Sequence, residues 1–173
     1  MKKIMMGLGV VAVLGLLVVL GIGTAFSGKK SVGRAFALEQ KSERVFETLS
    51  SLERLPELGI GVKSVKLPSD GSRPGPGYKF ELQTEYGAAE AEIVTYDAPR
   101  VLSFDVTLKG KKVGNLSFEL QGGDGATTDL DVKLNLDSPP PLGGLKNLGA
   151  QWTVSTLLES SADKMKEALE SAK

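Results

Sequence analysis

The sequence predicts an α+β domain in which an antiparallel sheet of seven strands packs its dry face against a long C-terminal helix, with one transmembrane helix in front. Three observations support this prediction. Residues 4–26 carry no charge, five segments in the middle of the chain alternate apolar and polar residues, and residues 142–172 hold an apolar stripe at helical spacing without a proline.

The N-terminal segment, residues 1–30, is predicted to be a membrane anchor. A helix formed by its uncharged residues 4–26 would reach about 35 Å, enough to cross a hydrocarbon core of about 30 Å. A cleaved signal peptide is the alternative, with Gly23 and Ala25 as small residues at a cleavage site, although the apolar region of such a peptide usually has about 7 to 15 residues. We therefore expect a single-pass anchor followed by one domain over residues 31–173.

The side of the membrane is less clearly encoded. Lys2 and Lys3 precede the apolar run and Lys29 and Lys30 follow it, so the positive-inside rule gives a near tie. A very short N-terminal tail most simply stays inside while the rest of the chain is exported. We expect the domain on the extracytoplasmic side.

Composition excludes several classes of site. The chain contains no cysteine and no histidine, so it cannot form disulfides, thiolate or histidine metal sites, a Cys nucleophile or a Ser-His-Asp triad. No metal or cofactor is expected. Four of the 21 basic residues lie in residues 1–30, which leaves 17 against 21 acidic residues and a net charge of −4 in the domain. This balance argues against nucleic acid as a partner.

The first half of the domain is predicted to contain a strand over residues 31–40, a helix, and a short strand over residues 62–67. Ser42 is the expected N-cap of the helix, whose apolar residues recur at helical spacing. The helix should end before Pro56 or Gly59, because these residue types stop helices.

Residues 68–77 (PSDGSRPGPG) contain three prolines and three glycines and are predicted to form a loop. The segment GSRPGPGYK is not a phosphate-binding P-loop, which needs Gly-Lys followed by Ser or Thr at the start of a helix. Here a strand follows, so a mobile or structural turn is expected.

The clean alternation after this loop indicates an antiparallel sheet with one wet and one buried face. Glu85, Glu90 and Glu92 fall on the wet face and are poor catalytic candidates. The inward set consists of Tyr78, Phe80 and Leu82; Ala89, Ala91 and Ile93; Leu102, Phe104, Val106 and Leu108; Leu116, Phe118 and Leu120; and Leu130, Val132, Leu134 and Leu136.

The C-terminal segment, residues 142–172, follows three prolines and is predicted to be one amphipathic helix. Its apolar stripe runs along one side and can cover the dry face of the sheet. The stripe consists of Leu145, Leu148, Trp152, Leu158, Ala162, Met165 and Leu169.

The order of these elements resembles the START-like (SRPBCC) superfamily, which includes polyketide cyclases, plant pathogenesis-related allergens and coenzyme Q-binding proteins. Four segments carry the resemblance, and together they cover essentially all of residues 31–173. They are SERVFETLSSLERLPEL (42–58), YDAPRVLSF (96–104), GGDGATTDLDV (122–132) and the helix over 145–169. The resemblance implies a helix-grip fold, in which a curved sheet wraps the C-terminal helix and leaves a cavity between them. Many members carry a tryptophan shortly after the proline that ends the first helix, whereas Glu57 and Leu58 follow Pro56 here.

The inward face is nearly free of ionisable groups, so it offers an apolar lining rather than acid-base chemistry. Ala89 and Ala91 are small residues in the middle of a buried strand, so the space beside them is either filled by larger neighbours or left as an apolar pocket. Both outcomes remain open at this point. The residues predicted to bind a ligand are Phe80, Tyr86, Ala89, Ala91, Phe104, Val106, Phe118, Leu134 and Trp152.

These observations predict noncatalytic binding or carriage of a hydrophobic small molecule, such as a lipid, quinone or polyketide-like compound, by a membrane-tethered monomer. The alternatives are a cyclase or dehydrase-type enzyme that acts by shape and a few Tyr, Thr or Asn contacts, and a tethered interaction module with a filled core.

Overall fold

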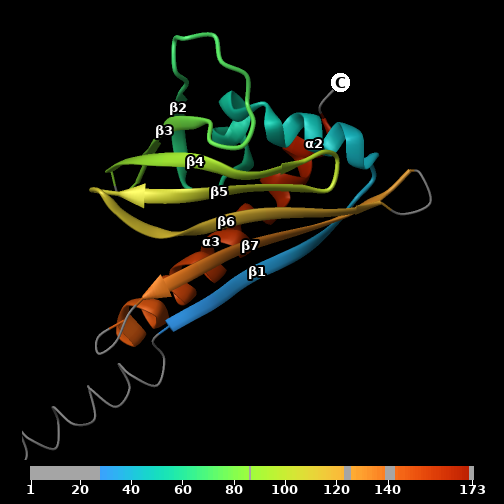
Figure 1. Ribbon diagram of the computed structural model, residues 1–173. Coiled ribbons are helices and arrows are strands. Elements are labelled where there is room, and N and C mark those ends of the chain that lie inside the picture. The colour runs from blue at the N-terminus through green and yellow to red at the C-terminus, as the bar shows by residue number, and fades with distance from the viewer. Residues whose placement is uncertain (1–27, 86, 123–125, 139–142, 172–173) are drawn as a thin grey trace, which may run out of the picture.

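The computed structural model describes residues 28–85, 87–122, 126–138 and 143–171, and for residues 137–138, 143–152 and 154 it describes the backbone alone. Seven antiparallel strands form one curved sheet, and a long C-terminal helix crosses its concave face (Figure 1). The elements are β1 (Gly28–Leu38), α2 (Ser42–Ser50), the 3-10 helix η1 (Leu52–Leu58), β2 (Val62–Lys66), β3 (Lys79–Thr84), β4 (Gly87–Asp97), β5 (Val101–Leu108), β6 (Lys111–Gly122), β7 (Thr128–Ser138) and α3 (Gly143–Glu170). The predicted α+β helix-grip architecture is confirmed.

The strands pair in the order β1-β7-β6-β5-β4-β3-β2, so the first strand closes one edge of the sheet beside the last one. Cross-strand neighbours share a face, and the register therefore reports which side chains point inward. Phe80 pairs with Ala91, which pairs with Val106, and all three belong to the inward set of the sequence. These side chains, which the sequence predicts to face inward, therefore share one face of the sheet.

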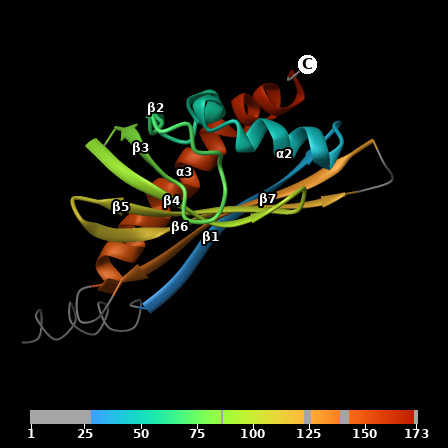
Figure 2. The same cartoon turned by 45° about the horizontal axis from the view of Figure 1, so that its top comes forward.

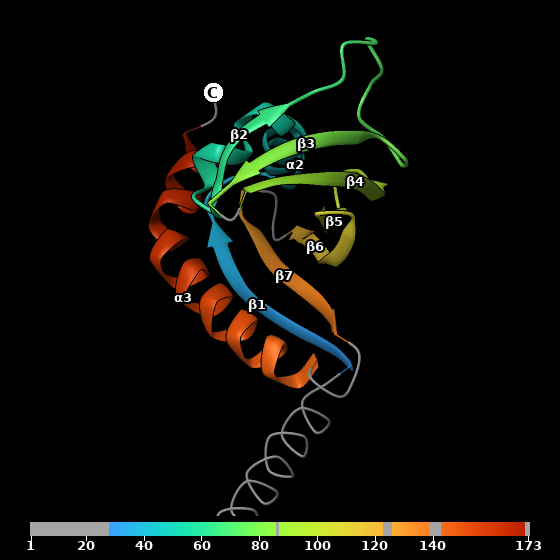
Figure 3. The same ribbon diagram turned by 90° about the vertical axis from the view of Figure 1, so that its left-hand side faces the viewer.

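The C-terminal helix α3 is held to the sheet and to η1 by polar contacts as well as by its apolar stripe. The Gln40 side-chain amide donates to the Glu170 carbonyl oxygen at 3.0 Å, and the Ser161 hydroxyl donates to the carbonyl oxygen of Gly59. Three apolar side chains of α3 are buried in the core: Leu158, Met165 and Leu169. Figure 3 shows α3 lying along β1 and spanning the open side of the sheet.

The two ends of the concave face are filled differently. At one end α2 and η1 pack beside α3, as Figure 2 shows, and their buried side chains close the space. Phe46 of α2 meets Tyr96 of β4 edge-on, with ring centroids 5.2 Å apart. The other end, which holds the β3–β4 and β5–β6 hairpins, has neither α2 nor η1 over it. This asymmetry decides where empty volume remains.

The main differences from the prediction lie at element boundaries. The single helix expected after residue 41 is divided: α2 ends at Ser50, and the 3-10 helix η1 continues through Pro56 to a left-handed cap at Gly59. Proline is tolerated there because it lies inside the short 3-10 helix η1 rather than inside an α-helix. Ser42 is the first helical residue rather than the N-cap, which is Lys41 without a side-chain cap bond.

A further difference concerns the first strand, which begins at Gly28 rather than at residue 31. Gly28 pairs with Ser138 at the end of β7, and the full length of β7 thus gains a partner. The lysine pair Lys29 and Lys30 therefore belongs to the sheet. No helix within the described residues is long and apolar enough to cross a membrane, and the segment predicted to do so lies outside them up to residue 27.

Candidate functional site

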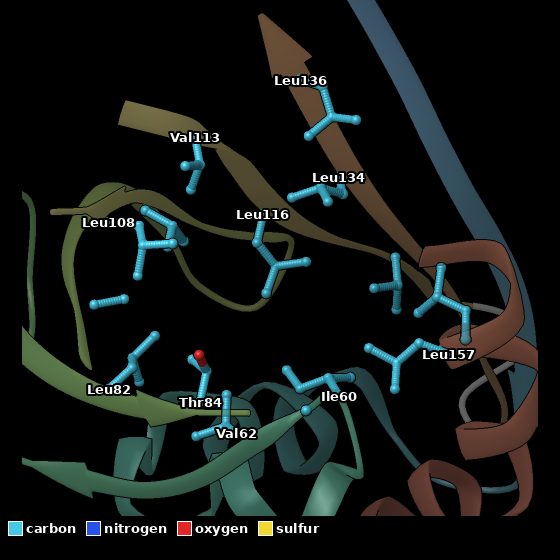
Figure 4. A pocket seen from close by; sticks show the side chains of 15 residues that line it. Ile60, Val62, Leu82, Thr84, Leu108, Val113, Leu116, Leu134, Leu136 and Leu157 are labelled. Carbon is cyan, nitrogen blue, oxygen red and sulfur yellow. The ribbon is translucent and has the colours of Figure 1, made fainter. Parts of the chain in front are cut away.

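A pocket of about 320 Å³ lies between the sheet and α3, at the end that α2 and η1 do not cover. Its wall comes from six strands, β2 to β7, from the segment after η1 and from the second half of α3. In Figure 4 the labelled side chains project from these elements toward one common space. The described lining residues are Ile60, Gly61, Val62, Leu82, Thr84, Ala89, Val106, Leu108, Val113, Leu116, Val132, Leu134, Leu136, Leu157 and Leu158.

The described wall is apolar apart from one hydroxyl, that of Thr84. This hydroxyl donates a hydrogen bond of 2.9 Å to the Gly87 carbonyl oxygen in the β3–β4 hairpin. No carboxylate, amine or guanidinium group is among the lining residues described. A ligand would therefore be held by contact with aliphatic groups, the usual mode for lipid-like molecules.

Small residues and one bulge create this space. Ala89 contributes only a methyl group, so the wall recedes between Leu82 and Leu108, its neighbours on the adjoining strands. Gly114 lies close to β7, where an added Cβ would come within 2.7 Å of the Asn135 carbonyl oxygen. Next to it, Val113 is the extra residue of a register shift, and this valine lines the pocket while 41% of its surface remains exposed.

The residues predicted to bind a ligand separate into three groups. Ala89, Val106 and Leu134 lie on the pocket wall. Phe80, Ala91, Phe104 and Phe118 are buried in the adjoining core, where Phe104 meets Phe80 and Phe118 edge-on at centroid distances of 5.6 and 6.0 Å. Tyr86 and the side chain of Trp152 lie outside the described part of the structure. The ligand-binding role of all nine residues stays a prediction.

Part of the wall lies outside the residues predicted to face inward. Ile60, Gly61 and Val62 belong to a connection and a predicted short strand, yet they line the pocket next to Leu157 of α3. A usable signal was present in the spacing of Gly59 and Gly61, which both adopt positive φ and direct the chain across the pocket edge. Leu157 carried no such signal, since it lies beside the apolar stripe rather than in it.

The acidic residues on the outer face do not contribute to the pocket. Glu90 is exposed and Glu92 partly exposed, and both flank the amino group of Lys79, at 3.8 and 3.5 Å. This arrangement agrees with the prediction of a solvated surface for these two glutamates.

Comparison with known protein families identifies the family of this chain. Residues 38–170 match the family described as polyketide cyclase/dehydrase and lipid transport. The chain belongs to this family. The START-like resemblance that the local motifs indicate is thereby confirmed.

Solved structures show the same fold at low sequence identity. The START superfamily protein of Mycobacterium smegmatis superposes with a TM-score of 0.62 and 16% identity, over 83% of this chain and 99% of that one. The ZhuI aromatase/cyclase of a Streptomyces species gives 0.59 and 12%, over 83% and 92%. A norcoclaurine synthase point mutant of Thalictrum flavum gives 0.61 and 12%, over 84% and 97%.

No curated protein matches the chain in sequence. Members of this family share a fold more than a function, so the comparisons support hydrophobic ligand binding or cyclase activity as a class. The choice between these two must come from the chemistry of the pocket.

Proposed function

We propose that this protein binds or carries a hydrophobic small molecule, a lipid, quinone or polyketide-like compound, in the pocket between the sheet and α3. The observation that carries the proposal is the wall itself, in which Thr84 supplies the one polar side chain described. A volume of about 320 Å³ lies within the range of small-molecule sites. Burial of apolar ligand surface would supply the binding energy, at roughly 25 cal/mol per Å².

The wall favours binding over catalysis. A cyclase-type reaction needs at least one positioned acid or base within hydrogen-bond reach of the reacting atoms. The Thr84 hydroxyl already donates to Gly87, and the lining residues described include no second polar group that converges with it. The open pocket also disfavours an interaction module with a filled core.

Residues 1–27 are proposed to tether this domain as a monomer to the membrane, on its extracytoplasmic side. The support for the tether is the uncharged run over residues 4–26, which is long enough to cross a hydrocarbon core as a helix. A ligand that partitions into the bilayer would be concentrated where the tether keeps the pocket.

The test uses two alanines that follow each other on β4. Ala89 is buried and lines the pocket, whereas Ala88 is exposed on the other face of the same strand. Ala89→Leu would place three extra carbons inside the pocket, and Ala88→Leu adds the same atoms to the outer surface. Native mass spectrometry of the full chain, with extraction of the bound molecule, measures ligand occupancy in both variants.

We expect the full chain to carry a hydrophobic molecule. Its occupancy should fall at least about tenfold in Ala89→Leu, because the added leucine carbons displace apolar ligand surface whose burial contributes roughly 1.4 kcal/mol or more to the binding free energy. Ala88→Leu should retain the occupancy of the natural chain. Equal occupancy in the two variants, or a protein that never carries such a molecule after exposure to lipid extract and quinones, would contradict the proposal.

A further inference from the structure

The pocket opens at the end of the sheet where two lysine-rich segments meet. One is the start of β1, with Lys29 and Lys30, and the other is the β5–β6 hairpin, with Lys109, Lys111 and Lys112. We call these five residues the basic rim. Figure 3 looks onto this end of the molecule and shows that the chain enters the domain here, at the first residue of β1.

The register places two of these lysines at the pocket mouth. Lys111 is the cross-strand partner of Leu108, and Lys30 is the partner of Leu136. Both leucines line the pocket, and cross-strand partners share a face of the sheet. Lys30 of β1 and Lys111 of β6 therefore project from the same face as the pocket wall.

The charges of the rim are mostly uncompensated. Lys112 pairs with Asp105, whereas Lys30, Lys109 and Lys111 make no ion pair with any residue whose side chain is described. Asp137 is the cross-strand register partner of Lys29, and Glu85 lies in the neighbouring β3–β4 hairpin. Even with all three acidic residues counted, this end of the domain is positive, although residues 28–173 as a whole carry a net charge of −2.

An apolar side chain lies among these lysines. Val113 follows Lys111 and Lys112 and is 41% exposed, one of two large hydrophobic residues described as exposed. Val113 lines the pocket together with Leu136. The same two residues also border a second, polar hollow, which Lys29, Lys30 and Lys112 help to form. The basic surface and the apolar pocket are thus contiguous at Val113.

The β5–β6 hairpin carries a lysine, Lys109, at its tip. Lys109 and Gly110 both have positive φ, 50° and 72°, the geometry of a tight two-residue turn in which Asn-Gly is the preferred pair. Lysine is disfavoured at the first of these positions because its Cβ crowds the backbone. A positive charge is therefore held at the tip in a conformation that an asparagine would adopt with less strain.

We propose that the basic rim with Val113 is a docking surface for an anionic lipid bilayer, onto which the pocket opens. Lysines attract the acidic headgroups, and Val113 reaches the interface between headgroups and acyl chains. Residues 1–27, which contain the apolar run 4–26, join the domain at Gly28, directly before Lys29 of the rim. This connection and the charge complementarity favour a bilayer over an acidic protein as the occupant. The inference rests on the proposed function, in which the ligand comes from the membrane.

The absence of cysteine from the chain allows a direct test. The full chain with Val113→Cys is labelled with a polarity-sensitive fluorophore and reconstituted into phosphatidylcholine vesicles with or without phosphatidylglycerol. A lipid-borne quencher reports contact of the label with the bilayer. Arg73→Cys, in the exposed loop at the other end of β2 and β3, is the control position.

We expect the Val113 label to be quenched and blue-shifted in the anionic vesicles and to become aqueous at high salt, because exposed charges are screened. The Arg73 label should stay aqueous in both lipids. A Val113 label that is aqueous in anionic vesicles, or equally quenched in neutral ones, would overturn the proposal.

Charge variants provide the second arm. Lys109→Asn with Lys111→Gln should lower the ratio of docked to undocked domain about tenfold or more, since each lysine near an anionic surface contributes several-fold. Lys41→Gln with Lys164→Gln removes two exposed lysines elsewhere and should leave the ratio unchanged. Equal effects of the two pairs would overturn the role of the rim. Ligand occupancy, measured separately by native mass spectrometry, distinguishes failure of docking from failure of the proposed function.

Discussion

The hydroxyl of Ser161 in α3 donates a hydrogen bond to the carbonyl oxygen of Gly59, the left-handed cap of η1. The contact joins residues 102 positions apart in the chain. Ile60, Gly61 and Val62 follow on one side and Leu157 and Leu158 precede on the other, and all five line the pocket. This single contact therefore holds two walls of the pocket together.

Gly59→Ala should lower the free energy of unfolding by about 1–2 kcal/mol, for two reasons. The residue has φ +71°, which disfavours any side chain, and an added Cβ would lie 3.3 Å from both Cβ and Oγ of Ser161. Gly71 has the same φ with nothing within 4 Å, so Gly71→Ala measures the cost of the conformation alone. Urea denaturation of both variants gives the comparison. A loss no larger in Gly59→Ala than in Gly71→Ala would mean that α3 adjusts without cost.

Asp105 on β5 provides a pH-dependent contribution to stability. Partial burial raises the pKa of its carboxyl group, but hydrogen bonds from Lys112 and Asn115 and the charge of Lys112 outweigh this effect, so the pKa lies below its ordinary value. Because the pKa is lower in the folded state than in the unfolded state, the stabilisation is present above about pH 4 and is lost as the pH falls through the folded-state value.

Asp105→Asn should keep the hydrogen bond with Asn115 and lose the ion pair with Lys112. We expect about 0.5–1 kcal/mol less stability at neutral pH, a value typical of partly exposed pairs. The difference from the natural chain should shrink as the pH falls below about 4. Denaturation at several pH values measures it, with Asp129→Asn, at an exposed position of β7, as the control. A difference that is constant down to low pH would show that the charge of Asp105 is not its source.

Trp152 lies in the apolar stripe of α3 and is the only tryptophan of the chain, so intrinsic fluorescence reports on it alone. The sequence predicts that its indole faces Phe104 and Phe118 and borders the pocket. Blue-shifted emission that changes when a hydrophobic ligand is added is the expected result. Trp152→Ala should cost about 3–5 kcal/mol where the core is tightly packed, and less beside an open cavity. Emission like that of indole in water, unmoved by ligands, would place the side chain on the surface.

Much of the fold was predictable because its signals are local. Strict period-two alternation identified the inward faces of β3 to β7, since successive side chains of a strand point to opposite sides. The boundary errors arose where a neighbour in space extends or divides an element. β1 starts at Gly28 because β7 offers a partner as far as Ser138, and the residue pattern around Gly28 has no local sign of that.

The sequence by itself determined which residues face inward and that this face is apolar. It could not determine which of these residues pack in the core and which border a cavity. Phe80 and Ala89, for example, are both apolar residues at inward positions of adjacent strands, and their sequence patterns do not distinguish them. The tertiary structure decided this through long-range placement. Phe80, Phe104 and Ala89 all belong to the buried core, but Ala89 alone of the three borders the pocket, at the end that α2 and η1 leave uncovered. Empty volume depends on where distant segments stop, and that is a property of the packed chain rather than of any one stretch of it.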